Sequence, residues 1–133
     1  MRPGERADAI RVLVVEPDLF FAEFVAGILR DARPEFVVRE VPSLSGALDH
    51  LFAAGGADLI ITNVAVADDE GPAVAASLRR AAPEAAIFVL SAAGDTDLAI
   101  GCLRSGADRV LPKRKLTATS FLAAIREVVG WSL

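Results

Sequence analysis

The sequence predicts an α/β domain in which a mostly parallel sheet carries helices on both faces. Short apolar runs alternate with longer segments whose apolar residues recur at helical spacing, and this alternation repeats five times in 133 residues. Pro, Gly, Asp or Ser stands at most of the junctions between the two kinds of segment. Short connections of this type favour right-handed crossovers, which make the strands parallel.

The first strand and helix are predicted at Ile10–Val15 and Leu19–Ala32. The strand is apolar except for one arginine, and Pro17 ends it because proline cannot continue a hydrogen-bonded ladder. Asp18 is a good N-cap for the helix that follows. The helix carries one apolar stripe at helical spacing, formed by Phe21, Phe24, Val25, Ile28 and Leu29.

The next three elements are predicted at Phe36–Val41, Leu44–Ala54 and Asp58–Asn63. Two charged residues in the second strand indicate an exposed position near the edge of the sheet, and a Gly-Gly pair closes the second helix. The third strand is apolar through its middle, which is typical of a strand covered on both faces. It ends in Asn63, at the end of a strand where α/β sheets hold their ligands.

The second half of the chain continues the same alternation. A loop at Val64–Gly71 leads to a helix that begins with proline, and a basic loop at Pro112–Leu116 precedes the last helix. The remaining elements are predicted at Pro72–Ala82, Ala86–Leu90, Asp95–Ser105, Arg109–Leu111 and Thr117–Val129.

Composition indicates a soluble globular chain and excludes several kinds of site. Hydrophobic residues make up 53%, charged residues 24%, and the net charge of −4 disfavours nonspecific nucleic-acid binding. A lone cysteine (Cys102) excludes an internal disulfide, and a lone histidine (His50) argues against a histidine metal site. No signal peptide or membrane-spanning run is present, so a cytoplasmic location is expected. We expect a flexible leader at 1–9, one domain at 10–130, and a tail or linker at 131–133.

Four stretches resemble the receiver domain of two-component response regulators. They are the first strand with its following acid, Arg11–Glu16; the third strand and loop, Asp58–Gly71; the end of the fourth strand, Phe88–Ala92; and Gly106–Lys113. Each is weak alone, but their order and spacing are specific and cover Ile10–Val129. The resemblance implies a flavodoxin-like (CheY-like) three-layer fold with strand order 2-1-3-4-5 and a site at its topological switch point.

The resemblance also gives roles to single positions. In the family, an aspartate after the third strand accepts a phosphoryl group, two acids after the first strand help hold Mg²⁺, and a hydroxyl and a lysine contact the phosphoryl group. A switch aromatic stands near the fifth strand. The matching positions here, in that order, are Asn63, Glu16 and Pro17, Ser91, Lys113 and Val110. The acceptor, one metal-holding acid and the aromatic ring are therefore missing.

These departures predict a disarmed phosphorylation site. Phosphoryl transfer to a carboxylate uses an anionic oxygen, whereas the Asn63 amide offers a neutral one. Mg²⁺ is held by hard oxygen ligands in octahedral geometry, and Pro17 has no side-chain ligand. We therefore expect weak or absent Mg²⁺ binding, no cofactor and no catalytic residue.

Charge counting predicts a direct or bridged ion pair in the emptied pocket. Glu16 and Lys113 are the charged residues that remain in the matched set, and their charges cancel. We expect them to pair directly, or through Asn63 or water. Arg114 stands where the family usually has a proline with a cis peptide bond. The Lys113–Arg114 bond should be trans, because a cis bond before a non-proline residue costs ~3 kcal/mol.

Other interpretations of the same residues remain open. Asn63 is also explained as a strand-end residue that bonds loop amides. Asp18, or Asp68 and Asp69 in the acidic loop, offer carboxylates for a Mg²⁺-dependent phosphoacceptor, although an N-cap role explains Asp18 equally well. The emptied pocket is also a candidate site for a small molecule or anion. A nucleotide is disfavoured because no Gly-rich loop follows the first strand.

The resemblance favours a non-enzymatic signalling module that acts through protein contacts. Receiver domains commonly dimerise through the fourth helix, fifth strand and fifth helix, so a protein partner or a second copy is expected on that face. Its expected residues are Leu98, Leu103, Val110, Phe121 and Arg126. A DNA-binding output domain is expected outside this chain, and no membrane partner is expected.

Overall fold

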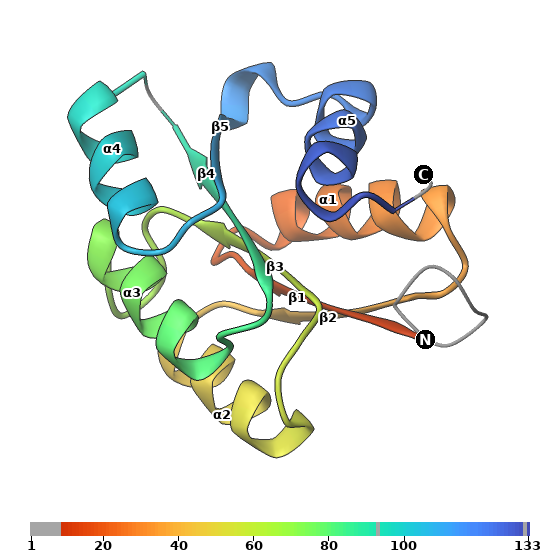
Figure 1. Ribbon diagram of the computed structural model, residues 1–133, viewed down its shortest axis with the longest axis horizontal. Helices are drawn as coiled ribbons and strands as arrows, with labels where there is room; N and C mark the ends of the chain where they lie inside the picture. Colours follow the sequence, from red (N-terminus) through yellow and green to blue (C-terminus); the bar gives the residue numbers. More distant parts are fainter. Residues whose placement is uncertain (1–8, 93, 132) are drawn as a thin grey trace.

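The computed structural model describes residues 9–92, 94–131 and 133. Within them, one sheet has the order β2-β1-β3-β4-β5, and all neighbouring strands are parallel (Figure 1). The strands are β1 Ile10–Val15, β2 Phe36–Val41, β3 Leu59–Asn63, β4 Ala86–Ser91 and β5 Arg109–Pro112. The helices are α1 Leu19–Ala32, α2 Leu44–Ala54, α3 Pro72–Ala81, α4 Thr96–Arg104 and α5 Ala118–Val129, with a 3-10 helix η1 at Lys113–Lys115. The predicted fold class and strand order are confirmed.

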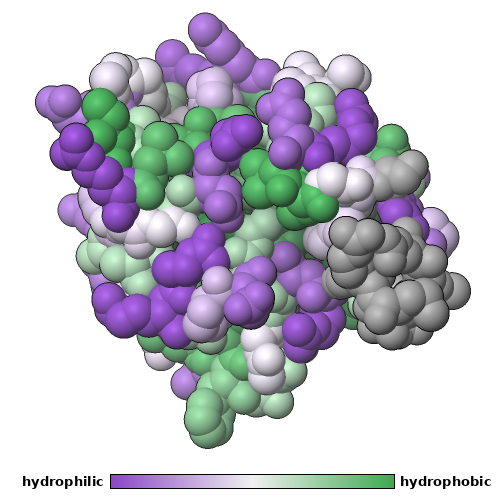
Figure 2. Space-filling model, in the orientation of Figure 1, coloured by the Kyte–Doolittle hydropathy of each residue, from purple (hydrophilic) through white to green (hydrophobic). Residues whose placement is uncertain are grey.

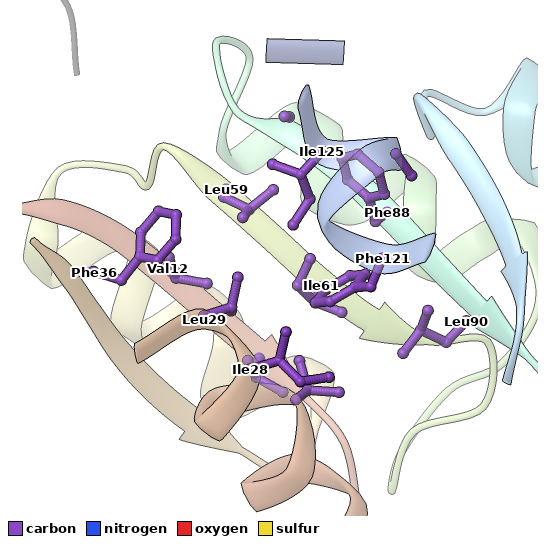
Figure 3. Close-up of a cluster of buried hydrophobic side chains, with 14 of the residues drawn as sticks. Val12, Ile28, Leu29, Phe36, Leu59, Ile61, Phe88, Leu90, Phe121 and Ile125 are labelled. Atoms are coloured by element: carbon purple, nitrogen blue, oxygen red, sulfur yellow. The ribbon is translucent and has the colours of Figure 1, made fainter. Parts of the chain in front are cut away.

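The sheet is the middle of three layers (Figure 1). Successive side chains of a strand point to opposite faces, so each strand contributes to two separate cores. On one face, α1 and α5 pack on a cluster whose central side chains are drawn in Figure 3 and include Val12, Leu29, Ile61, Phe88 and Phe121. On the other face, α2, α3 and α4 pack on a cluster that includes Leu13, Leu51, Ile60, Leu78 and Ile87.

The position of each strand in the sheet explains its composition. All six residues of β4 and the first four of β3 are buried, because helices cover both faces of these inner strands. β2 is an edge strand and is more exposed, as its two charged residues predicted. The inner apolar runs therefore fix the strands whose carboxyl ends carry Asn63 and Ser91.

Helix ends follow the capping residues, with small shifts from the predicted bounds. Asp18 caps α1 as predicted, its carboxylate accepting the N–H groups of Phe20 and Phe21. Gly55 closes α2 in the left-handed conformation at φ 75°. Asp95 and Thr117 were predicted as the first residues of the last two helices but are their N-caps, because their side chains accept from the first turn.

A tight turn at Gly106 sets the direction of β5 and of the loop after it. Gly106 has φ 123°, a conformation that other residues rarely adopt, and a Cβ there would lie 2.7 Å from Cβ of Arg79. Arg79 donates to the Gly106 carbonyl from Nε at 3.0 Å and Nη2 at 2.8 Å, and to the Asp108 carboxylate at 3.0 Å. This network fixes the start of β5 against α3 and so fixes where the strand delivers Lys113.

The exposed apolar side chains are scattered over several elements. Figure 2 shows hydrophobic side chains in separate groups among hydrophilic ones.

One correction concerns α1, because Phe24 was predicted on the buried stripe but is 47% exposed. The neighbouring ring of Phe21 lies closer to the sheet, and the two ring centroids are 5.6 Å apart. Phe24 therefore lies at the border between the buried and the exposed side of α1.

The chain ends of the predicted domain are described only in part. Residues 1–8 of the predicted leader and Ser132 of the predicted tail lie outside the described residues. Trp131 packs against the core cluster beneath α1 and α5, with its ring centroid 5.9 Å from that of Phe36.

Candidate functional site

Parallel strands bring the predicted site residues to one edge of the sheet. Glu16 follows β1, Asn63 and Ser91 end β3 and β4, and Lys113 follows β5. All four strands run in the same direction, so their carboxyl ends meet on one side (Figure 1). In the register, Asn63 lies beside Leu90 and Ser91 lies beside Pro112. Ser91 is buried at this edge.

The centre of this edge is an ion pair between Glu16 and Lys113. Glu16 is only 4% exposed, and Lys113 Nζ donates directly to its Oε1. The second carboxylate oxygen, Oε2, accepts the backbone N–H of Asp18 at 3.1 Å. Both oxygens of this buried acid thus have a donor, and its charge is balanced by the lysine. The two residues were predicted to pair directly or through a bridge, and the structure has the direct arrangement.

Lys113 is also held by an aromatic ring that was not predicted from the sequence. Its Nζ lies 4.3 Å from the centroid of the Phe21 ring, which is within the range of a cation–π interaction. The available signal was the position of Phe21, one helical turn after the cap of α1. No cis peptide bond occurs in the described part of the chain, so the Lys113–Arg114 bond is trans, as predicted. The lysine reaches the pocket with this trans bond.

Asn63 shapes the loop that follows β3. Its Nδ2 donates to the carbonyl of Ala65 at 2.6 Å. The loop is closed by a bridge between Ala65 and Glu70 and by the N–H of Gly71, which donates to the Val64 carbonyl at 2.8 Å. Asn63 was predicted to bond loop amides, whereas the observed bond runs from its own amide to a loop carbonyl. A carboxylate at this position has no N–H to make this bond.

Pro17 and Asp18 lie at the exposed lip of the same edge. Oδ1 of Asp18 accepts the N–H of Phe20 at 3.0 Å and that of Phe21 at 3.2 Å. This carboxylate is therefore directed toward the first turn of α1. The geometry agrees with its predicted N-cap role and accounts for its place after the first strand.

The acidic loop residue Asp68 is anchored to the start of α2. Its two oxygens accept the backbone N–H groups of Leu44 at 2.7 Å and Ser45 at 3.0 Å. These two bonds lower the pKa of the Asp68 carboxyl below its ordinary value, and the bond from Ser45 has the larger effect. Asp69 is engaged locally, with Oδ1 accepting the N–H of Glu70 at 2.8 Å. Within the described residues, no group of three or more acidic, histidine or cysteine side chains is arranged to hold a metal ion.

One residue of the predicted contact face is misplaced. Phe121 was included in the contact face, but it is fully buried in the cluster beneath α1 and α5, because it lies on the inner side of α5. Leu98 and Val110 are half-buried against the opposite cluster. Leu103 is 44% exposed on α4, and Arg126 is exposed on α5.

Two exposed features of this face were not foreseen. Ile100 is 40% exposed on α4, three residues before Leu103 and therefore on the same side of the helix. Arg109 of β5 reaches Glu127 of α5 at 3.8 Å. The helical spacing of Ile100 and Leu103 was a signal available in the sequence.

The sequence model of a family described as "response regulator receiver domain" matches residues 12–126. No curated protein sequence gives a match. In the described residues, no helix is both long enough and apolar enough to cross a membrane.

Several solved structures have a similar fold. The signal receiver domain of the NarL response regulator from Mycobacterium tuberculosis is 22% identical, with a TM-score of 0.79 over 94% of this chain and 99% of that one. A response regulator from Chloroflexus aurantiacus is 22% identical, with a TM-score of 0.81 over 92% and 99%. A response regulator from Burkholderia pseudomallei, solved with a phosphorylated aspartic acid, calcium ion and citrate, is 27% identical, with a TM-score of 0.75 over 86% and 65%.

Proposed function

Since the chain belongs to the response regulator receiver domain family, we propose that it is an atypical receiver that is not phosphorylated at position 63. It is a non-enzymatic module of two-component signalling that acts through contacts with another protein or a second copy. The observation that carries this proposal is the buried pair of Glu16 and Lys113, which neutralises the pocket from within.

The ion pair takes the place of a bound cation. A buried carboxylate needs a compensating charge and hydrogen-bond donors. Glu16 obtains the charge from Lys113 and a donor from the N–H of Asp18. A metal ion would have to displace the ammonium from Oε1, which would leave that ammonium without its carboxylate partner.

The remaining side chains do not fit Mg²⁺. The Pro17 side chain has no atom that could bind a metal ion, and Oδ1 of Asp18 accepts N–H groups of the first turn of α1. Asn63 supplies at most a neutral oxygen, and its amide nitrogen is committed to Ala65. Mg²⁺ demands near-octahedral oxygen ligands and is held largely through carboxylates. We therefore expect weak or absent Mg²⁺ binding and derive no step through a metal.

The acceptor chemistry supports the same proposal. The relative from Burkholderia pseudomallei was solved with a phosphorylated aspartic acid. By resemblance to the receiver motif, Asn63 stands at the acceptor position of this chain, and a carboxamide has no anionic oxygen for attack on phosphorus. Asp68, one of the alternative acceptors, uses both oxygens to hold the start of α2. Its phosphorylation would cost these two hydrogen bonds.

Intact-mass measurement tests the lack of phosphorylation. The wild-type chain is incubated with acetyl phosphate and Mg²⁺, and we expect its mass to stay unchanged. The variant Pro17→Asp/Asn63→Asp, treated in the same way, shows whether the conditions can phosphorylate this scaffold. A stoichiometric adduct on the wild type that disappears in Asp18→Asn, or in Asp68→Asn/Asp69→Asn, would overturn the proposal in favour of a substitute acceptor.

The proposed contact face lies on α4, β5 and α5. Ile100 and Leu103 are exposed apolar side chains on α4, a helix of nine residues. The Arg109–Glu127 pair and Arg126 add charged groups beside them. An apolar centre with a charged rim is the usual composition of a protein interface. An output domain outside this chain and a cytoplasmic location remain predictions.

A further inference from the structure

A cavity of about 340 Å³ lies between the start of α4 and the edge strand β5. Figure 1 shows these two elements together at the outer edge of the sheet. Ala99 and Ile100 line the cavity from α4, and Val110 and Leu111 line it from β5. This volume lies in the lower part of the range of small-molecule sites, which are mostly apolar with a few polar groups.

The polar groups of the cavity gather around its rim. Lys115 lines the cavity and is exposed to solvent, and within the described residues its ammonium has no ion-pair or hydrogen-bond partner. Thr96 opens α4 at the same cavity, so the partly positive start of that helix faces it. Asp95 also lines the rim, but its carboxylate is used to cap α4 through the N–H of Leu98 at 3.0 Å.

The backbone of β5 adds further polar groups. β5 pairs with β4 on one side and is the last strand in the order of the sheet. An edge strand presents N–H and C=O groups that no neighbouring strand satisfies. The cavity thus combines an apolar floor, an edge strand with hydrogen-bonding groups, an exposed lysine and an aspartate whose carboxylate is directed to the start of α4.

We propose that this cavity binds a small aromatic carboxylate. Its ring packs between Ile100 and Val110, and its carboxylate lies at the Lys115 ammonium. An apolar ring without a charge would leave the lysine unused, and an inorganic anion would leave the apolar floor unused. Of the residues matched to the phosphorylation site, Ser91 also lines this cavity, whereas Glu16, Asn63 and Lys113 do not. The site goes beyond the proposed function and does not rest on it, because neither the apolar floor nor Lys115 takes part in the Glu16–Lys113 pair.

A ligand in this cavity would touch both elements that carry the proposed contact face. Ile100 lines the cavity and is also exposed beside Leu103 on α4. Val110 lines it from β5. Occupation of the site would therefore alter the surface offered to a protein partner.

The test uses the full chain, NMR titration of its backbone amides, and two probes that differ by a carboxylate. Indole-3-acetate is expected to give saturable shifts at Ala99, Ile100 and Val110, with indole binding more weakly at the same residues. Lys115→Gln should weaken indole-3-acetate about fivefold and leave indole unchanged, because it removes one partly exposed ion pair. Arg114→Gln, which removes the neighbouring cation outside the cavity, should change neither affinity.

A second pair of variants tests the cavity itself. Val110→Phe fills the floor and should abolish binding of both probes, whereas Val37→Phe adds the same ring to the exposed strand β2 and should leave binding intact. Absence of saturable shifts in the wild type at millimolar probe would overturn the site. Equal affinities of Lys115→Gln and wild type for indole-3-acetate would overturn the role of the carboxylate. This last comparison needs only a surface substitution, so it holds even if Val110→Phe fails to fold.

Discussion

Lys113 and Glu16 are 97 positions apart in sequence and form the buried ion pair at the carboxyl edge of the sheet. The pair joins the end of β1 to the segment after β5, across β3 and β4, which carry Asn63 and Ser91. Because the Glu16 side chain is almost completely removed from water, the pair is a structural element of the fold as well as the centre of the disarmed site.

Lys113→Met should destabilise the domain. The change keeps much of the side chain's apolar stem but leaves the buried Glu16 carboxylate with the N–H of Asp18 and no opposite charge. Breaking one side of a buried pair commonly costs about 3–5 kcal/mol, and the partial exposure of Lys113 brings our expectation to about 2–3 kcal/mol. Urea denaturation measures the free energy of unfolding.

Two controls separate this effect from a general loss of surface charge. Arg30→Met breaks the exposed pair with Glu23, whose atoms are 3.3 Å apart, and should cost less than about 1 kcal/mol. The double variant Glu16→Gln/Lys113→Met removes both charges and should be more stable than the sum of the two single losses predicts. Equal, small losses in Lys113→Met and Arg30→Met would contradict a buried pair.

Asp68→Asn should lower stability at neutral pH, and its deficit should shrink in acid. The N–H groups of Ser45 and Leu44 lower the pKa of Asp68 in the folded state. A carboxyl with a lowered folded-state pKa contributes stability above its unfolded pKa, and this stability is lost as pH falls through the folded-state pKa. The difference in unfolding free energy between wild type and variant should therefore narrow as pH falls from 7 toward 3.

The matched control for Asp68 comes from the same loop. Asp69→Asn removes a charge next to Asp68 but touches no group of α2, since Asp69 accepts the N–H of Glu70. It should cost less than Asp68→Asn at neutral pH. A deficit of Asp68→Asn that stayed constant over the acid range would argue against the ionised bonds to α2.

Periodicity and turn chemistry predicted the fold because these signals are local. The apolar runs of β3 and β4, the Asp18 cap and the glycine after α2 each act within a few residues and were read correctly. Phe24 was misplaced because spacing along a helix gives a face but not the width of the surface that covers it. The same limit explains Phe121, which the contact face included although it belongs to the core.

Of the contacts in the candidate site, the sequence predicted the one that follows from opposite charges. Glu16 and Lys113 were the remaining opposite charges of the motif, so their contact followed from electrostatics. The anchoring of Asp68 on α2, 24 residues earlier, and the ring of Phe21 under the lysine depend on how elements cross in space. Nothing in the local pattern around these residues distinguishes them from a solvated acid or an ordinary core aromatic.

Leu103→Asp should weaken contacts made through the α4-β5-α5 face. Leu103 is exposed, so the substitution leaves the core intact while it places a charge in the apolar centre of the proposed interface. We expect self-association, measured by sedimentation equilibrium over a range of concentrations, to weaken about tenfold or more. Phe52→Asp changes a side chain that is 92% exposed on α2 and should have no effect. A wild-type chain that stays monomeric throughout would exclude the homodimer and leave a different protein as the partner.

Asn63→Asp alone should fail to restore efficient phosphorylation. The new carboxylate would supply an acceptor, but Pro17 still provides no metal ligand and Lys113 still occupies the Glu16 carboxylate. It would also lose the bond that the Asn63 amide donates to Ala65, so the loop after β3 would be less well held.

Pro17→Asp/Asn63→Asp places three acids around the lysine and gives the pocket the negative charge that favours Mg²⁺. Intact mass after incubation with acetyl phosphate and Mg²⁺ should show little adduct on the single variant and clearly more on the double one. Full modification of Asn63→Asp by itself would mean that Pro17 does not limit the site, and that the missing acceptor alone silences it.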